Sequence, residues 1–212
     1  MLIEDLGILG YRDTWEAQER AHAEVLAGAE ERVLLVEHPP VITFGRRGVT
    51  PFLLASQKQL EERGVEVVES DRGGDVTFHG PGQMVAYPII RLGEHGLTPS
   101  SYVHMLEGVV VRTLGDFGVE ARTEAGAVGV WVDSGAAKIA AIGVRVRRGV
   151  SLHGLALNVS TDLRYFDLIV PCGLVGRGVT SLREILGERT PDFTAVQSLL
   201  IHHLKTALSM EP

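Results

Sequence analysis

The chain has 212 residues, of which 45% are hydrophobic and 22% charged, and its formal net charge is -7 at pH 7. This composition is typical of a globular protein with enough apolar residues for a core, and its negative charge argues against nucleic acid, which favours a basic surface. No apolar run approaches the roughly 18 residues of a membrane span, and the single cysteine, Cys172, excludes an intrachain disulfide and a cysteine-based zinc site.

The first part of the chain predicts one helix followed by several strands. Glu4 and Asp5 stand where an export signal would be basic, so we expect a cytoplasmic protein. The helix is expected over residues 14–28. Segments rich in valine and isoleucine, bounded by Gly, Pro or Asp, predict strands over 32–38, 65–70 and 83–90.

Three Thr-Pro pairs predict the starts of further helices. Threonine caps unpaired N–H groups, and proline in the first helical position loses no hydrogen bond there. The pairs are Thr50-Pro51, Thr98-Pro99 and Thr190-Pro191, and apolar residues recur at helical spacing after the second and third. A shorter helix is expected to begin near Thr180.

The second part of the chain predicts strands over 126–133, 137–148 and 150–160. The last two are joined by Arg148-Gly149, which suits a tight hairpin turn. Because helices alternate only loosely with strands and hairpins occur, we expect an α+β fold with a mixed or antiparallel sheet and helices packed on it. No repeat or linker interrupts residues 1–212, which predicts a single domain.

Cys172 lies in "FDLIVPCGLVGRGVTSL", between Pro171 and Gly173. A free cysteine often behaves as a small buried hydrophobic residue. The flanking Pro and Gly instead predict a turn, and turns bring side chains to the surfaces of clefts. The residues alone leave both interpretations open.

Lys138 is one of only three lysines and the only charged residue from Gly135 to Val144. An ammonium in such a strand must reach water, find a partner or lose its proton, although a lysine that guards an edge strand fits equally well. If Lys138 lies beside Cys172, the cysteine would be a workable nucleophile. The ammonium would stabilise the thiolate, or a neutral lysine would accept the thiol proton.

Other motifs of catalysis are weak or missing. His79 and His153 each precede a glycine in a strand-like segment, but a lone histidine is more often structural. The sequence has no HExxH motif, no GxxxxGK[ST] phosphate loop and no GxGxxG dinucleotide loop. We therefore expect no metal and no other cofactor.

The segment "RGGDVTFHGPGQMVAYP" closely resembles the signature of the octanoyltransferases of lipoate biosynthesis, also called lipoyl(octanoyl) transferases. The residues that carry this resemblance are Arg72, Gly73, Gly74, Thr77, Phe78, His79, Gln83 and Tyr87. "EHPPVITFGRRG", "AAKIAAIGVRV", "HGLALNV" and "YFDLIVPCGL" are similar to other landmarks of this family, in the same order. The resemblance covers nearly the whole chain.

The resemblance implies the fold of the biotin and lipoate protein ligases. It also implies transfer of an octanoyl group from acyl carrier protein to a lysine of a lipoyl domain. We expect a monomer, although the sequence does not determine the oligomeric state. By the same resemblance, Cys172 is the acyl-thioester nucleophile and Lys138 lowers its pKa. The implied substrate-binding residues are Arg72, Gly73, Gly74, Asp75, Val76, Thr77, Phe78, His79, Ala141, Ile142, Gly143, Gly154, Leu155 and Ala156.

The residue types of these segments suit an acyl slot. Glycine lets the backbone approach a substrate closely, and apolar side chains would form the walls, namely Ala140, Ala141, Ile142, Leu155 and Ala156. Three alternatives remain: an ATP-dependent lipoate or biotin ligase on the same fold, an acyl thioesterase, and a non-catalytic module that binds acyl carrier or lipoyl domains.

Overall fold

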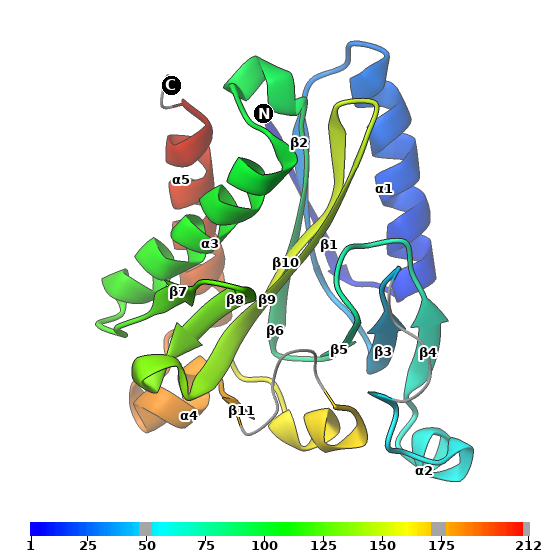
Figure 1. Ribbon diagram of the computed structural model, residues 1–212, viewed down its shortest axis with the longest axis vertical. Helices are drawn as coiled ribbons and strands as arrows, with labels where there is room; N and C mark the ends of the chain where they lie inside the picture. The colour runs from blue at the N-terminus through cyan, green and yellow to red at the C-terminus, as the bar shows by residue number, and fades with distance from the viewer. Residues whose placement is uncertain (47–51, 171–176, 210–212) are drawn as a thin grey trace.

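The structure is a computed structural model, and it describes residues 1–46, 52–170 and 177–209 (Figure 1). Within these residues, the main sheet has eight strands in the order β1-β2-β6-β10-β9-β8-β7, with β11 beside β9. All neighbours along this order are antiparallel except β1, which is parallel to β2. The strands are β1 Leu2–Ile8, β2 Arg32–Glu37, β6 Gln83–Ile89, β7 Arg122–Glu124, β8 Ala127–Val132, β9 Ala137–Arg147, β10 Val150–Asn158 and β11 Gly178–Val179.

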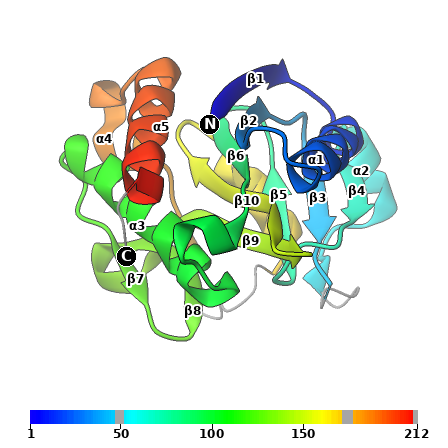
Figure 2. The same cartoon turned by 90° about the horizontal axis from the view of Figure 1, so that it is seen from above.

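A second, smaller sheet has the order β4-β3-β5, with strands β3 Val41–Phe44, β4 Glu66–Glu69 and β5 Val76–His79. The α-helices are α1 Tyr11–Leu26, α2 Gln57–Glu62, α3 Pro99–Asp116, α4 Leu182–Leu186 and α5 Phe193–Ser209. Figure 2 shows α3 and α5 on one side of the main sheet, and α1 with the small sheet on the other. None of the described helices is long and apolar enough to cross a membrane.

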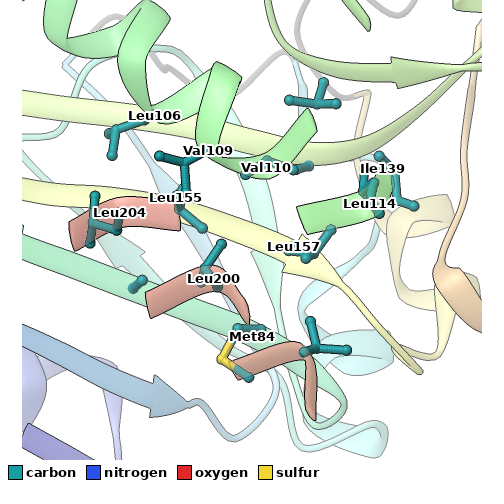
Figure 3. Close-up of a cluster of buried hydrophobic side chains, with 14 of the residues drawn as sticks. Met84, Leu106, Val109, Val110, Leu114, Ile139, Leu155, Leu157, Leu200 and Leu204 are labelled. Carbon is teal, nitrogen blue, oxygen red and sulfur yellow. The ribbon is translucent and has the colours of Figure 1, made fainter. Parts of the chain in front are cut away.

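Both faces of the central strands are buried, which the alternation of side chains along β6 makes clear. Met84 and Ala86 belong to the hydrophobic cluster under α3 and α5, part of which is drawn in Figure 3. Val85 and Tyr87 belong to a cluster on the opposite face, beside α1. Successive residues of a strand point to opposite faces. The strand therefore supplies one face to the core and the other to the side where the small sheet lies.

The predicted mixed sheet with packed helices is confirmed, and so is the hairpin between β9 and β10. Arg147 pairs with Val150, and the two turn residues, Arg148 and Gly149, have φ values of 54° and 83°. Two positive φ values are typical of the type I′ turn, whose twist matches that of paired strands. The other predicted strands are also present, with bounds that differ by one or two residues.

The Thr-Pro pairs have three different outcomes. Thr98 caps α3 as predicted, in a capping box with Ser101. Thr190 does not cap α5, so that prediction is wrong. Its hydroxyl donates to Gly187 O at 2.6 Å, and the carbonyl of Asp192 accepts the N–H of Val196, which places the start of the helix later. Thr50-Pro51 lies outside the described residues, and the next helix, α2, is capped by Ser56.

Several elements were not predicted, and α1 begins earlier than expected. Strands β1, β3 and β5 are short or lie among glycines and prolines, so periodicity gives little signal. Thr14, the expected start of α1, is fully buried inside the helix, where its hydroxyl donates to Gly10 O at 2.8 Å.

Candidate functional site

A cavity of about 330 Å³ is lined by residues of both sheets. From the small-sheet side come residues of β5 and of the preceding loop, and from the main sheet come residues of β6, β9 and β10. The predicted residues that line the cavity are Arg72, Gly74, Asp75, Val76, Thr77, His79, Lys138, Ala141, Ile142, Gly143, Gly154, Leu155 and Ala156. Two segments far apart in the sequence therefore meet at one site, as the resemblance implies.

Small residues form the main-sheet side of the cavity. Ala141 of β9 pairs with Ala156 of β10, which pairs with Val85 of β6. Gly143 and Gly154 form the second cross-strand pair beyond Ala141 and Ala156, after Ile142 and Leu155. Such residues leave open space above a sheet, whereas larger side chains would fill it.

The expected side walls are only partly correct. Leu155 is 2% exposed and belongs to the core cluster under α3 and α5, as Figure 3 shows, and Ala140 belongs to the same cluster. Ile142 packs against that cluster as well. Ile142 and Leu155 thus line the cavity but also pack with the core under α3 and α5, whereas Ala141 and Ala156 alternate with them along β9 and β10 and face the cavity side.

The glycines of the "RGG" loop serve mainly to bring backbones together. Gly73 N–H donates to Val144 O at 3.0 Å. A Cβ at Gly73 would lie 3.0 Å from that oxygen, and a Cβ at Gly143 would lie 2.8 Å from Gly73 O. Gly74 has φ +83°, a conformation that L side chains rarely adopt. These glycines let the loop lie directly on β9, whereas the sequence had suggested that they allow the backbone to approach the substrate.

Arg72 is buried and holds this loop in place. Its guanidinium donates to Thr43 O at 2.6 Å, to Asp75 O at 3.0 Å and to Gly73 O at 2.9 Å. Its Nε also donates to the hydroxyl of Thr43 at 3.2 Å. A planar group with five donors suits this set of carbonyl and hydroxyl acceptors. Arg72 therefore joins the loop to the small sheet and places a positive charge beside the cavity.

Gly73 and Phe78 were predicted to bind substrate, but neither lines the cavity. Phe78 lies in a separate cluster, stacked on Tyr165 at 4.7 Å between ring centroids and edge-on to Phe166 at 5.5 Å. Alternation along β5 explains the difference, since Thr77 and His79 stand on either side of Phe78 in the strand and line the cavity.

Three buried histidines lie near the cavity, His38, His79 and His153, and hydrogen bonds assign the tautomers of the first two. His38 donates from Nδ1 to Leu9 O at 2.8 Å and accepts the hydroxyl of Tyr87 on Nε2 at 2.9 Å. His79 donates from Nδ1 to Gln83 Oε1 at 2.7 Å, because the amide of Gln83 is itself a donor to Phe78 O. Each ring thus carries one proton in this network and is neutral.

Burial favours this neutral state. It lowers the pKa of His38 to about 4. Burial, aided by Arg72 and Arg145, lowers the pKa of His153 to about 3. Burial, with smaller contributions from His38 and Arg72, also holds the pKa of His79 well below its usual value. The lone pair of neutral His79 is on Nε2, which lies 3.4 Å from the hydroxyl of Thr43, and the low pKa of His79 makes it a weak base.

His153 reaches this side of the sheet through an unusual backbone conformation. Leu155 and Leu157 of the same strand point to the core, so a regular strand would direct His153 there as well. His153 instead has φ +58°. The pairing of β10 with β6 ends at Leu155, opposite Ala86, and Pro88 beyond it has no N–H for the ladder. Its own N–H donates to Gln18 Oε1 at 2.8 Å, and its Nε2 bonds Asp71 Oδ1 at 2.7 Å.

Lys138 lines the cavity because of a bulge in β9. Val130 pairs with Ala140 and Trp131 with Lys138, so Ile139 is the additional residue of the bulged strand. Both Ile139 and Ala140 are buried in the core, which leaves Lys138 on the cavity face together with Ala141. Bulges frequently direct a side chain in this way beside active sites.

The ammonium of Lys138 has an aromatic neighbour and a carbonyl acceptor. Its Nζ lies 4.7 Å from the ring centroid of Trp131 and donates to Val128 O at 2.9 Å. The guanidinium of Arg177 lies 4.7 Å from the same ring. The cation–π contact and the carbonyl both favour the protonated lysine.

Cys172 lies outside the described residues. The strand that follows it in the sequence, β11, pairs with β9 at Lys138, with Gly178 opposite Ala137 and Val179 opposite Lys138. The N–H of Thr180 donates to Lys138 O at 2.9 Å. The described chain after Cys172 therefore runs beside Lys138.

Several residues that line the cavity were not predicted: Tyr11, Gln83, Val85, Tyr87, Gly126, Ala127, Val128, His153, Asn158, Phe166 and Val179. Gln83 and Tyr87 belong to the signature segment, and His153 had been noted for its glycine neighbour. Tyr11 gave no sequence signal. Among the described residues, no group of three or more His, Cys, Asp or Glu side chains is placed to hold a metal ion.

Comparisons with known proteins show which proteins this chain is similar to. Residues 10–205 match the family model of the lipoyl protein ligase A/B catalytic domain. A protein named octanoyltransferase from Roseiflexus sp. (strain RS-1) is 49% identical over 214 residues, which cover 100% of this chain and 89% of that protein.

Solved structures show the same fold at low identity. A bi-partite lipoate protein ligase from Thermoplasma acidophilum has a TM-score of 0.76 at 18% identity, covering 100% of this chain and 86% of that one. The biotin protein ligase of Aquifex aeolicus has a TM-score of 0.56 at 12% identity, covering 98% and 68%. The predicted ligase-like fold is confirmed.

Proposed function

Because this chain belongs to the lipoyl protein ligase A/B catalytic-domain family and is an octanoyltransferase, we propose that it moves an octanoyl group from acyl carrier protein to a lysine of a lipoyl domain through a thioester on Cys172. The whole chain acts as one catalytic domain. Acyl carrier protein as the donor, lipoyl domains as the acceptors and a monomeric state are parts of the same proposal.

In the first half-reaction, the thiolate of Cys172 attacks the carbonyl carbon of the octanoyl thioester. The bond to the carrier's sulfur breaks, and the carrier leaves as a thiolate that takes up a proton. One thioester replaces another, so the step is nearly balanced in energy. The ammonium of Lys138 stabilises the attacking thiolate, as a nearby cation does for a reactive cysteine.

In the second half-reaction, the amine of the acceptor lysine attacks the octanoyl-Cys172 carbonyl. An amide forms, the Cys172 sulfur leaves, and the amine loses a proton. Amide formation from a thioester is downhill, so neither step needs ATP. Lys138 is the proposed base for this proton, since acylation removes the thiolate charge that favoured its protonated form. The low pKa of buried His79 makes that residue the weaker candidate.

The observation that carries the proposal is that Lys138 stands at the edge of a small-residue slot. Lys138 and Ala141 share one face of β9, and Ala156, Gly143 and Gly154 continue that face across the sheet. A hydrocarbon chain laid on this surface gains about 0.8 kcal/mol for each buried methylene. Its carbonyl end then lies toward Lys138.

A transfer assay without nucleotide tests the proposal. The enzyme is mixed with octanoyl-loaded acyl carrier protein and a lipoyl domain, and the lipoyl domain is weighed by intact mass spectrometry. We expect a gain of one octanoyl group without ATP, and no gain with Cys172→Ala. Transfer only when ATP and free octanoate are supplied would identify a ligase. Release of free octanoate alone would identify a thioesterase, and no reaction at all would support a binding module.

A further inference from the structure

A buried carboxylate on α3 lies within one peptide group of Lys138. Glu107 is 2% exposed, on the side of the main sheet opposite the cavity. Burying a carboxylate is costly unless hydrogen bonds compensate. Glu107 accepts the N–H of Gly129 on Oε1 at 2.9 Å, and its Oε2 lies 2.9 Å from Nδ1 of His104.

The N–H of Gly129 and the carbonyl of Val128 belong to the same peptide group. The oxygen of that group accepts the ammonium of Lys138 at 2.9 Å. The contacts therefore run in one line, from the carboxylate of Glu107 through the peptide to the ammonium of Lys138. The dipole of the peptide is aligned with both charges, because its N–H faces the anion and its C=O faces the cation.

The local backbone is built to hold this peptide against Lys138. Gly129 has φ +127°, which is strained for any other residue. A Cβ there would lie 2.7 Å from Ala140 O and 3.0 Å from Cε of Lys138. Gly129 is thus required where β8 passes closest to the lysine, beside the bulge that directs Lys138 to the cavity.

We propose that Glu107 is a positioning residue for the first half-reaction, in which it holds the Lys138 ammonium in place and protonated beside the thiolate by polarising the Val128–Gly129 peptide. The proposal rests on the proposed role of Lys138 at Cys172. A carboxylate bonded to an N–H makes the carbonyl of that peptide a stronger acceptor, since hydrogen bonds in a chain strengthen one another. Glu107 itself does not touch the substrate.

The charged groups on the neighbouring elements do not replace Glu107 as the anion at the end of this line of contacts. On α3, His104 faces it directly. Strand β8 carries no charged side chain, and β9 contributes Lys138. On β7, Arg122 and Glu124 pair with each other, and Glu124 also pairs with Arg177. On α5, His203 pairs with Asp116 of α3, while His202 and Lys205 are the other titratable residues of that helix.

The experiment uses the small number of lysines. With lysine labelled at Cε, NMR shows one titrating signal for each of Lys58, Lys138 and Lys205, and Cys172→Ser removes coupling to the thiol. Glu107→Gln keeps an oxygen for Gly129 but loses the charge. We expect it to lower the titration midpoint of Lys138 by about one pH unit, the low end for a nearby charge, since the contact passes through a peptide. Lys58 and Lys205 should not move.

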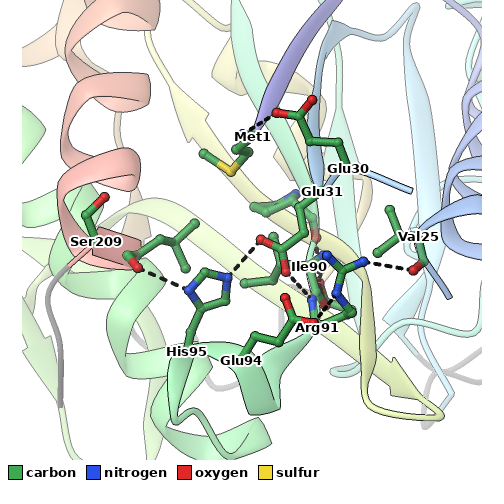
Figure 4. Close-up of polar contacts among 12 residues, drawn as sticks. Met1, Val25, Glu30, Glu31, Ile90, Arg91, Glu94, His95 and Ser209 are labelled. Atoms are coloured by element: carbon green, nitrogen blue, oxygen red, sulfur yellow. Dashed lines mark hydrogen bonds and ion pairs between the residues drawn. The ribbon is translucent and has the colours of Figure 1, made fainter. Parts of the chain in front are cut away.

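Glu31→Gln is the matched control. Glu31 is another buried carboxylate that accepts one backbone N–H, from Arg91 at 2.6 Å, and one histidine, His95 at 2.8 Å (Figure 4). It belongs to a network at the end of β6 away from Lys138, so its substitution should leave the Lys138 signal unchanged. An equal change in both variants would indicate a general structural effect and would overturn the proposal.

Two further measurements separate the possible outcomes. If Glu107→Gln does not fold, the wild-type amide signal of Gly129 serves instead, and it should shift with the midpoint of Lys138. No such shift, or an unchanged Lys138 midpoint in Glu107→Gln, overturns the role of Glu107. Alkylation of Cys172 against pH in Lys138→Met tests the proposed function separately. If the alkylation rate depends on pH in this variant as it does in the wild type, Lys138 does not activate Cys172.

Discussion

Replacing Ala156 by leucine should shorten the acyl slot without changing the chemistry at Cys172. Ala156 is 4% exposed and lies on the cavity face of β10, between Ala141 and Val85. Its neighbours in the strand, Leu155 and Leu157, point to the core. A longer side chain at this position therefore enters the cavity rather than the core.

The expected magnitude follows from the space that leucine takes. Leucine carries about three more carbons than alanine, so it displaces about three methylenes of the acyl chain from the slot, each of which contributes about 0.8 kcal/mol. The loss is roughly 2.4 kcal/mol, or about 50-fold in kcat/KM for octanoyl transfer at 1.4 kcal/mol for each tenfold change. A butanoyl chain, which does not reach the same depth, should lose much less.

The assay is transfer to a lipoyl domain from carrier proteins loaded with octanoyl or butanoyl groups, reported as the ratio of kcat/KM values. Ala195→Leu, an exposed position on α5, is the matched control and should leave the ratio unchanged. Urea unfolding of both variants shows whether the fold is intact. An Ala156→Leu enzyme that folds and keeps the wild-type ratio would refute the slot on this face of β10.

Three other predictions concern the lysine, the loop and the histidines. Lys138→Met should shift the alkylation profile of Cys172 to higher pH, because the thiolate loses a cation, whereas the exposed Lys205→Met should not. Gly143→Ala places a Cβ 2.8 Å from Gly73 O, so we expect about 1–3 kcal/mol of lost stability in urea unfolding and slower transfer; Gly115→Ala, with nothing within 4 Å, should not destabilise. Folding lowers the pKa of His38 to about 4, so the unfolded state binds more protons between about pH 4 and pH 6.5. The contribution of neutral His38 to the free energy of unfolding is complete above about pH 6.5 and is lost as the pH falls toward 4. At pH 5 this contribution is about 2 kcal/mol smaller than at pH 7. His38→Gln should therefore show a smaller loss of stability between pH 7 and pH 5, and an equal loss would contradict this reasoning.

Local sequence rules predicted the elements whose signals are local. Arg148-Gly149 gave the hairpin because a two-residue turn depends on its own φ values, and Thr98 gave the start of α3 because its cap lies within one turn. Thr190 failed because a nearer carbonyl, Gly187 O, takes its hydroxyl. The strands next to glycine and proline, β3 and β5, gain their stability from pairing that no local pattern reveals.

The residues that meet at the cavity were more predictable than their orientations. The signature segment and the resemblance indicated Lys138, residues 72–79 and the two glycine-containing strand segments, and most of these residues line the cavity. Alternation alone would have placed Lys138 and Ala140 on one face, and only the bulge at Ile139 separates them. His153 likewise turns by a positive φ just beyond the end of the pairing between β10 and β6. Such irregularities depend on partners distant in the sequence, which the pattern of one strand does not contain.

The most direct test of this account is the mass of the enzyme after brief mixing with octanoyl-loaded acyl carrier protein, without an acceptor. The account predicts one added octanoyl group that hydroxylamine removes, that fragmentation maps to Cys172, and that a lipoyl domain discharges in a single turnover. An octanoyl group on any other residue, or an enzyme of unchanged mass under conditions where it catalyses transfer, would contradict the covalent mechanism.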